Sequence, residues 1–92
     1  MADDEKAIQR ETTIRLGRKA RDVLASEAFQ SAMDEIMWDL HAQFLSTTAE
    51  DAVTRERLWA TGQAMSSIKN KLDSFVEVGK VEERNKALDA EQ

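Results

Sequence analysis

Apolar residues recur every three or four positions along most of the chain, which is the period of an amphipathic α-helix. One such stripe comprises Phe29, Met33, Ile36, Leu40 and Phe44. A second stripe, with alternating three- and four-residue spacing, comprises Leu58, Thr61, Met65, Ile68, Leu72 and Phe75. The second spacing is close to a heptad repeat, and no stretch shows the strict alternation typical of a strand. The pattern therefore predicts two amphipathic helices.

The ends of these two helices are predicted from capping residues. In the stretch S-T-T-A-E-D, Thr47 is followed three residues later by Glu50, which is the spacing of a capping box. We expect one helix to end near Ser46 and the next to begin at Thr48. Gly79 suits a left-handed C-cap, so we expect the second of these helices to end there.

Two long helices joined by a short turn predict an antiparallel hairpin, in which equal counting from Thr47 places Phe29 near Met65. The first helix has roughly 21 residues and the second roughly 31, so the second overhangs its partner by several turns. Residues 12–25 are expected to cover this overhang as a shorter helix. Ser26 is a suitable N-cap for the helix that follows, so we expect a bend there.

Composition agrees with a helical fold, because the chain has no proline and only three glycines. We predict an all-α fold: a long antiparallel helical hairpin with a shorter N-terminal helix, in a single domain spanning 1–92. Its ends, residues 1–11 and 80–92, are candidates for fraying, and the alternative for the polar stretch after Gly79 is that it extends the helix. A chain of 92 residues buries a thin core and, without cysteine, has no disulfide to reinforce it. We therefore expect the protein to be oligomeric.

Two tryptophans lie away from the predicted core. Trp38 is about 180° from the core stripe around its helix, on the same side as Leu45. Trp59 lies beside Gly62, where the missing side chain would leave a shallow groove. Because tryptophan is enriched at interface hot spots, we predict that these four residues form an interface. The alternative is that each ring lies flat on its own helix and shields apolar atoms.

A basic run, R-L-G-R-K-A-R, contrasts with the net charge of −5. Arg15, Arg18, Lys19 and Arg21 form a candidate patch for phosphates or for an acidic protein surface, and the alternative is a solvated helix face. No aromatic residue lies among them to stack on bases, so a nucleic acid ranks behind a protein partner. The acidic face of a second copy is one such partner.

Residues that carry chemistry are sparse. His41 is the only histidine, and a metal site needs several convergent ligands, so we predict no metal, no cofactor and no catalytic residue. No apolar run approaches the roughly 20 residues that span a bilayer, and the acidic start M-A-D-D-E-K lacks the apolar region of a signal peptide. We expect an intracellular protein that does not enter a membrane.

About half of the chain resembles a known group of proteins. The stretches F-x-x-A-M-D-E-I-x-x-D-L, T-T-A-E-D-A-V-T-R-E-R-L-W and I-K-N-K-L-D-S-F-V-E-V-G-K, between Phe29 and Lys80, are similar to small uncharacterised helical proteins encoded by tailed bacteriophages. The resemblance implies a phage protein that acts in the virion or in the cytoplasm of the bacterial host. It carries over no catalytic residue.

The function predicted from these features is that of a non-enzymatic, self-associating helical protein, such as a phage virion structural or assembly component. One alternative is a small regulator that binds nucleic acid through the basic N-terminal helix. Another is a phage-encoded inhibitor of a host protein, for which the acidic net charge is the only indication.

Overall fold

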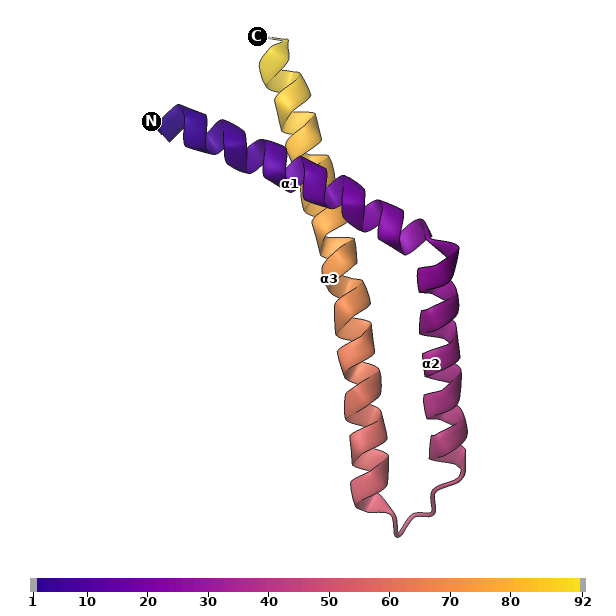
Figure 1. Cartoon of the computed structure of the whole chain (residues 1–92). Helices are drawn as coiled ribbons and strands as arrows, with labels where there is room; N and C mark the ends of the chain where they lie inside the picture. Colours follow the sequence, from indigo (N-terminus) through magenta and orange to yellow (C-terminus); the bar gives the residue numbers. More distant parts are fainter. Residues whose placement is uncertain (1, 92) are drawn as a thin grey trace. The chain divides into compact units, whose positions relative to one another are not determined.

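The computed structural model describes residues 2–91 of the chain, and within this range it is all-helical without strands. This confirms the predicted all-α class. The three helices are α1 (Ala2–Ala25), α2 (Glu27–Leu45) and α3 (Ala52–Ala90). The helices form two compact units, and α3 contributes to both of them (Figure 1). Unit 1 comprises Met1–Leu24 and Lys71–Gln92, and unit 2 comprises Ala25–Asn70.

Two predicted helix ends are wrong. The first helix begins at Ala2 rather than near residue 12, and α3 continues past Gly79 to Ala90. Gly79 is no left-handed cap, since no glycine of the described residues has a positive φ. The helix continues because the residues after Gly79 are mostly good helix formers, Glu, Lys, Arg and Ala. Residues 1 and 92, which belong to the tails predicted to fray, lie outside the described range.

The predicted N-cap at Ser26 is confirmed. Its backbone is extended, with φ −66° and ψ 128°, and its hydroxyl oxygen accepts a hydrogen bond of 3.3 Å from the backbone N–H of Phe29. This bond satisfies one of the N–H groups that the first turn of α2 leaves without an intrahelical partner. Glu27 in the first turn adds a favourable interaction with the helix dipole. Ser26 therefore ends α1 and starts α2.

The connection between α2 and α3 does not contain the predicted capping box, and α3 begins after Asp51 rather than at Thr48. The Thr47 hydroxyl donates to the carbonyl oxygen of Phe44 at 2.6 Å and accepts from Nε of Arg55 at 2.8 Å. The carboxylate of Asp51 accepts from the backbone N–H of Thr48 at 3.0 Å. These bonds fix the connection in a turn, so the helix starts later than the sequence pattern suggests.

Unit 2 consists of α2 and the first part of α3, which extend from the connection toward the same side with opposite chain directions (Figure 1). None of the residues of α2 is buried. Phe29, Met33 and Leu40, from the predicted core stripe, are only half-buried. The guanidinium of Arg55 lies 4.8 Å from the ring centroid of Phe44, within the range of a cation–π contact. The predicted pairing of Phe29 with Met65 stays a prediction.

Unit 1 contains the buried residues of the described part of the chain. In it α1 crosses the C-terminal part of α3 (Figure 1). Ile14 and Ala20 are 4% and 2% exposed, and Gly17 and Gly79 are buried between them. A Cβ built on Gly17 would lie 3.0 Å from the Cα of Gly79. The two backbones therefore touch, and glycine is needed at the crossing because it has no side chain to hold them apart.

Candidate interaction surfaces

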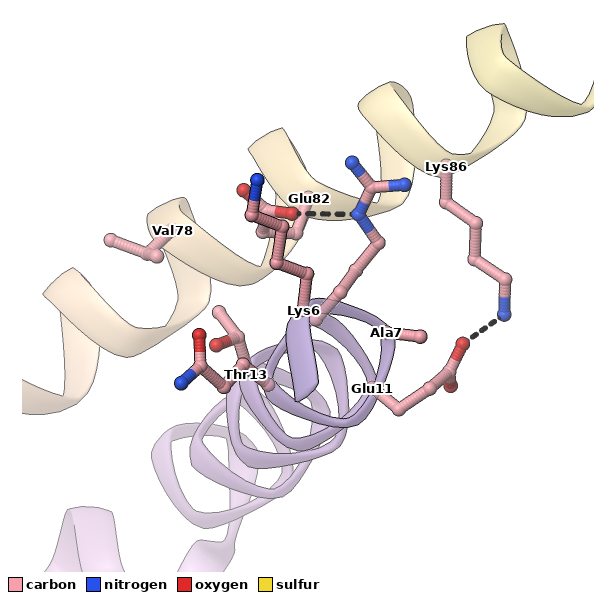
Figure 2. Close-up of a pocket in the computed structure, with 9 residues that line it drawn as sticks. Lys6, Ala7, Glu11, Thr13, Val78, Glu82 and Lys86 are labelled. Atoms are coloured by element: carbon pink, nitrogen blue, oxygen red, sulfur yellow. Dashed lines mark hydrogen bonds and ion pairs between the residues drawn. The ribbon is translucent and has the colours of Figure 1, made fainter. Parts of the chain in front are cut away.

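Arg10 of α1 binds two carboxylates of α3 in unit 1. Its Nε lies 3.0 Å from Oε2 of Glu82 (Figure 2). Its Nη1 lies 2.8 Å from Oδ2 of Asp89. Glu82 and Asp89 are seven residues apart and therefore share one face of α3. The hydrogen bonds to Asp89 and then to Glu82 raise the pKa of the Arg10 guanidinium. One arginine thus holds two turns of α3 against α1.

Two further ion pairs join the same helices. The amino group of Lys86 donates to the carboxylate of Glu11 (Figure 2), and Nε of Arg18 lies 2.9 Å from Oε1 of Glu83. The hydrogen bond from Lys86 lowers the pKa of Glu11. All of these groups are partly exposed, so each pair adds little to stability by itself. Together they fix which face of α1 meets α3.

A groove of about 570 Å³ lies beside these ion pairs, between α1 and α3. Its lining residues are Lys6, Ala7, Gln9, Arg10, Glu11, Thr13, Val78, Glu82 and Lys86 (Figure 2). Within the described part of the chain, all of its charged groups except Lys6 are paired across the two helices. The groove therefore favours neither a cation nor an anion, and its geometry suits helix packing more than ligand binding.

The structure separates the four residues of the predicted basic patch. Arg18 is paired with Glu83, and Arg18 and Arg21 line a small notch beside Gly79. Arg15 and Lys19 are exposed and have no ion pair in the range that the structure describes. Arg21 is likewise exposed without an ion pair in this range, so three of the four predicted residues are free to meet an anionic partner.

Trp38 projects from α2 and is 70% exposed, as its off-core position predicts. Leu45, seven residues later on the same face, is 69% exposed. Among the described residues, the aromatic ring beside Trp38 is that of His41, at 6.1 Å between centroids and 44° between planes. The ring is therefore not covered by another helix of the described chain, and the interface predicted for it stays a prediction.

Carboxylates surround Trp38. Asp34, Glu35 and Asp39 line a shallow depression together with the ring. The residues of α2 include no lysine or arginine, and these carboxylates form no ion pair among the described residues. We refer to Asp34, Glu35, Trp38, Asp39 and Leu45 as the Trp38 face. It combines an apolar centre with uncompensated negative charge.

Trp59 is 66% exposed on α3, in unit 2. A Cβ built on Gly62 would meet no atom within 4 Å, so the space beside this glycine is open. The shallow groove predicted around Trp59 stays a prediction.

In the range 2–91, no group of three or more His, Cys, Asp or Glu side chains is arranged to hold a metal ion. None of the helices in this range combines the length and the apolar character that crossing a bilayer requires.

Comparison of the chain with protein-family models, curated proteins and solved structures finds no match.

Sequence reasoning predicted that residues 12–25 cover the overhang of the last helix, and unit 1 agrees with this. It missed the backbone contact of Gly17 with Gly79 and the ion pairs between α1 and α3. The signal for the ion pairs was present, because Glu82 and Asp89 are seven residues apart and Arg10 and Arg18 lie on the first helix. It was missed because Gly79 was interpreted as a helix end, which left the residues after it without a partner. Gly17 was likewise interpreted as a weak point of the helix rather than as a contact.

Proposed function

We propose that this protein is a non-enzymatic helical protein that functions by self-association. The observation that carries the proposal is the exposure of both tryptophans, with Trp38 70% and Trp59 66% exposed. Large aromatic side chains contribute most when they are desolvated at the centre of an interface. Both rings lie on unit 2, in which no described residue is buried. They indicate a surface that is completed by another chain.

The amount of apolar surface supports the same proposal. Fourteen large hydrophobic residues are exposed among the described residues, whereas the buried apolar core consists of Ile14 and Ala20. A short chain with so small a core is usually stabilised by oligomerisation, a metal or disulfides. Cysteine is absent from this sequence, which excludes disulfides. The exposed apolar residues favour association with a second copy as the source of the missing stability.

The resemblance to phage-encoded helical proteins suggests where such association is used. We propose a structural or assembly role in a phage virion, with the bacterial host cytoplasm as the place of synthesis. Mass spectrometry of purified particles from a phage that encodes this sequence tests the role. Detection at a stoichiometric level supports a virion component, and detection only in the infected cell supports an assembly factor.

Self-association is tested by fluorescence, because Trp38 and Trp59 are the only two tryptophans. In a Trp59→Phe variant, Trp38 is the only indole. If Trp38 is desolvated by a second copy, its emission shifts to shorter wavelength and its quenching by acrylamide weakens as the protein is concentrated. The matched variant Trp38→Phe reports on Trp59 in the same way. Emission from both variants that is independent of concentration contradicts the proposal.

A second candidate function follows from Arg15 and Lys19, which are exposed and form no ion pair in the described range. Two uncompensated cations on one helix face suit the phosphates of a nucleic acid. A gel shift whose strength falls steeply with salt would support a nucleic-acid-binding regulator. This candidate ranks second because the net charge is −5 and no aromatic residue lies between the two cations.

A further inference from the structure

We infer that the Trp38 face of one copy binds the outer face of α1 of a second copy, formed by Ile8, Arg15 and Lys19. The inference rests on the proposed self-association and names the two surfaces that meet. Both faces are exposed in a single chain. Each copy therefore carries both halves of the contact.

The outer face of α1 is defined by helix spacing. Ile8, Arg15 and Lys19 follow one another at intervals of seven and four residues, which places them on one face. All three are exposed, and Ile8 is 66% exposed. The face consists of one apolar side chain and two cations whose charges are not compensated within the described residues.

Charge complementarity indicates that the outer face of α1 is the surface that binds the Trp38 face. The Trp38 face has three carboxylates without ion pairs, and α2 has no lysine or arginine to neutralise them. Facing charges of opposite sign steer association and fix its register. The indole ring between these carboxylates also favours a cation, since a guanidinium above a tryptophan face is a favourable contact.

The spacing of the two faces matches when the helices run antiparallel. Arg15 and Lys19 are about 6 Å apart along α1, and Asp34 and Trp38 are about 6 Å apart along α2. With Arg15 opposite Trp38 and Asp39, Lys19 lies opposite Asp34 and Glu35.

The same register brings the apolar ends together. Ile8 precedes Arg15 by seven residues, and Leu45 follows Trp38 by seven residues, so both lie about 10.5 Å from the centre of the contact. Ile8 therefore lies opposite Leu45, and this pair extends the apolar part of the interface. An apolar pair, a cation over an indole and two facing charge pairs all form in one register.

The contact is heterologous, because α1 of one copy meets α2 of the other. A heterologous contact allows complementation between two variants that each fail alone. Arg15→Glu with Lys19→Glu makes the outer face of α1 acidic and leaves the Trp38 face unchanged. Asp34→Lys with Asp39→Lys makes the Trp38 face basic and leaves α1 unchanged.

The experiment measures the mass of each variant, and of their equimolar mixture, by sedimentation at low salt. We expect each variant alone to dissociate about tenfold or more readily than the wild type, because like charges then face each other. In the mixture opposite charges face each other again, so association returns. Lys69→Glu with Lys71→Glu is the matched control for the α1 variant, since it lowers the net charge by the same amount at exposed positions of α3. Circular dichroism verifies that every variant stays helical.

Three results would overturn the inference. If Trp38→Ala abolishes association while both charge variants associate normally, self-association stands but α1 is not the occupant. If the equimolar mixture of the two charge variants fails to associate, α1 is likewise not the occupant. If the wild type is monomeric at every concentration, the proposed function fails as well. A wild type that is monomeric yet binds a DNA duplex through Arg15 and Lys19 assigns the outer face of α1 to nucleic acid.

Discussion

Gly17 and Gly79 bring α1 and α3 into backbone contact. A Cβ on Gly17 would lie 2.8 Å from the carbonyl oxygen of Phe75 and 3.0 Å from the Cα of Gly79. Both distances are shorter than van der Waals contact, and both neighbours are backbone atoms that cannot rotate away. The crossing in unit 1 therefore depends on these two residues being glycine.

Gly17→Ala is expected to lower the free energy of unfolding. Overpacking of this kind typically costs about 1 to 3 kcal/mol, and the better helix propensity of alanine returns about 1 kcal/mol. We expect a net loss of up to about 2 kcal/mol, measured by chemical denaturation. A gain in stability would mean that α1 and α3 do not touch at this point.

Gly62→Ala is the matched substitution at an open position of the same protein. A Cβ there meets no atom within 4 Å, so only the helix propensity changes. We expect a gain in stability of about 0.5 to 1 kcal/mol. A loss would show that a second chain approaches Gly62 closely, which would place this residue inside an interface.

The ion pair of Glu11 with Lys86 predicts a dependence on pH. The pKa of Glu11 is lower in the folded protein than its ordinary value of 4.5, because the carboxylate accepts a hydrogen bond from Lys86. Its contribution to stability is present above pH 4.5 and is lost as the pH falls through the lowered pKa. Glu11→Gln should therefore be less stable than the wild type at neutral pH and equally stable in strong acid.

Melting temperatures of the wild type and Glu11→Gln, measured from neutral pH down to strong acid, check the prediction. Glu5→Gln serves as control, since Glu5 lies on the same helix and has no ion pair in the described range. A difference between wild type and Glu11→Gln that is constant with pH would show that the pair with Lys86 does not form.

The sequence predicted the local structure of this chain better than its packing. The helical class and the N-cap at Ser26 follow from composition and from one residue type at one position, so both were predicted correctly. The connection was predicted less well, because Thr47 uses its hydroxyl for Phe44 and Arg55 instead of a capping box. When a side chain has several possible hydrogen-bond partners, the sequence does not show which of them it binds.

Gly79 illustrates why the backbone contact between α1 and α3 was not predicted. A glycine near the end of an apolar stripe has two physical uses, a left-handed cap or a close helix contact, and these have the same sequence signal. Only the position of Gly17 on another helix distinguishes them. The exposure of Trp38 and Trp59 was predicted from helix phase alone, because it depends on the helix that carries each ring.

Substitution of Trp38 should separate association from folding. Trp38→Ala removes an exposed ring, so we expect helicity to be unchanged and association to weaken by about 2 kcal/mol, or about 30-fold in the dissociation constant. Leu72→Ala, at a half-buried position, should lower stability by about 2 kcal/mol. Because association itself stabilises the fold, melts of both variants must be compared at several protein concentrations. Equal effects of Trp38→Ala and Leu72→Ala on the fold would assign Trp38 to the core.

Sedimentation equilibrium of the wild-type protein over a wide concentration range tests self-association most directly. The chain has a mass of 10.4 kDa, so any oligomer is readily resolved from it. We predict a mass above 10.4 kDa that falls toward this value on dilution, because the exposed tryptophans are covered by another copy. A mass of 10.4 kDa at every concentration would contradict the account.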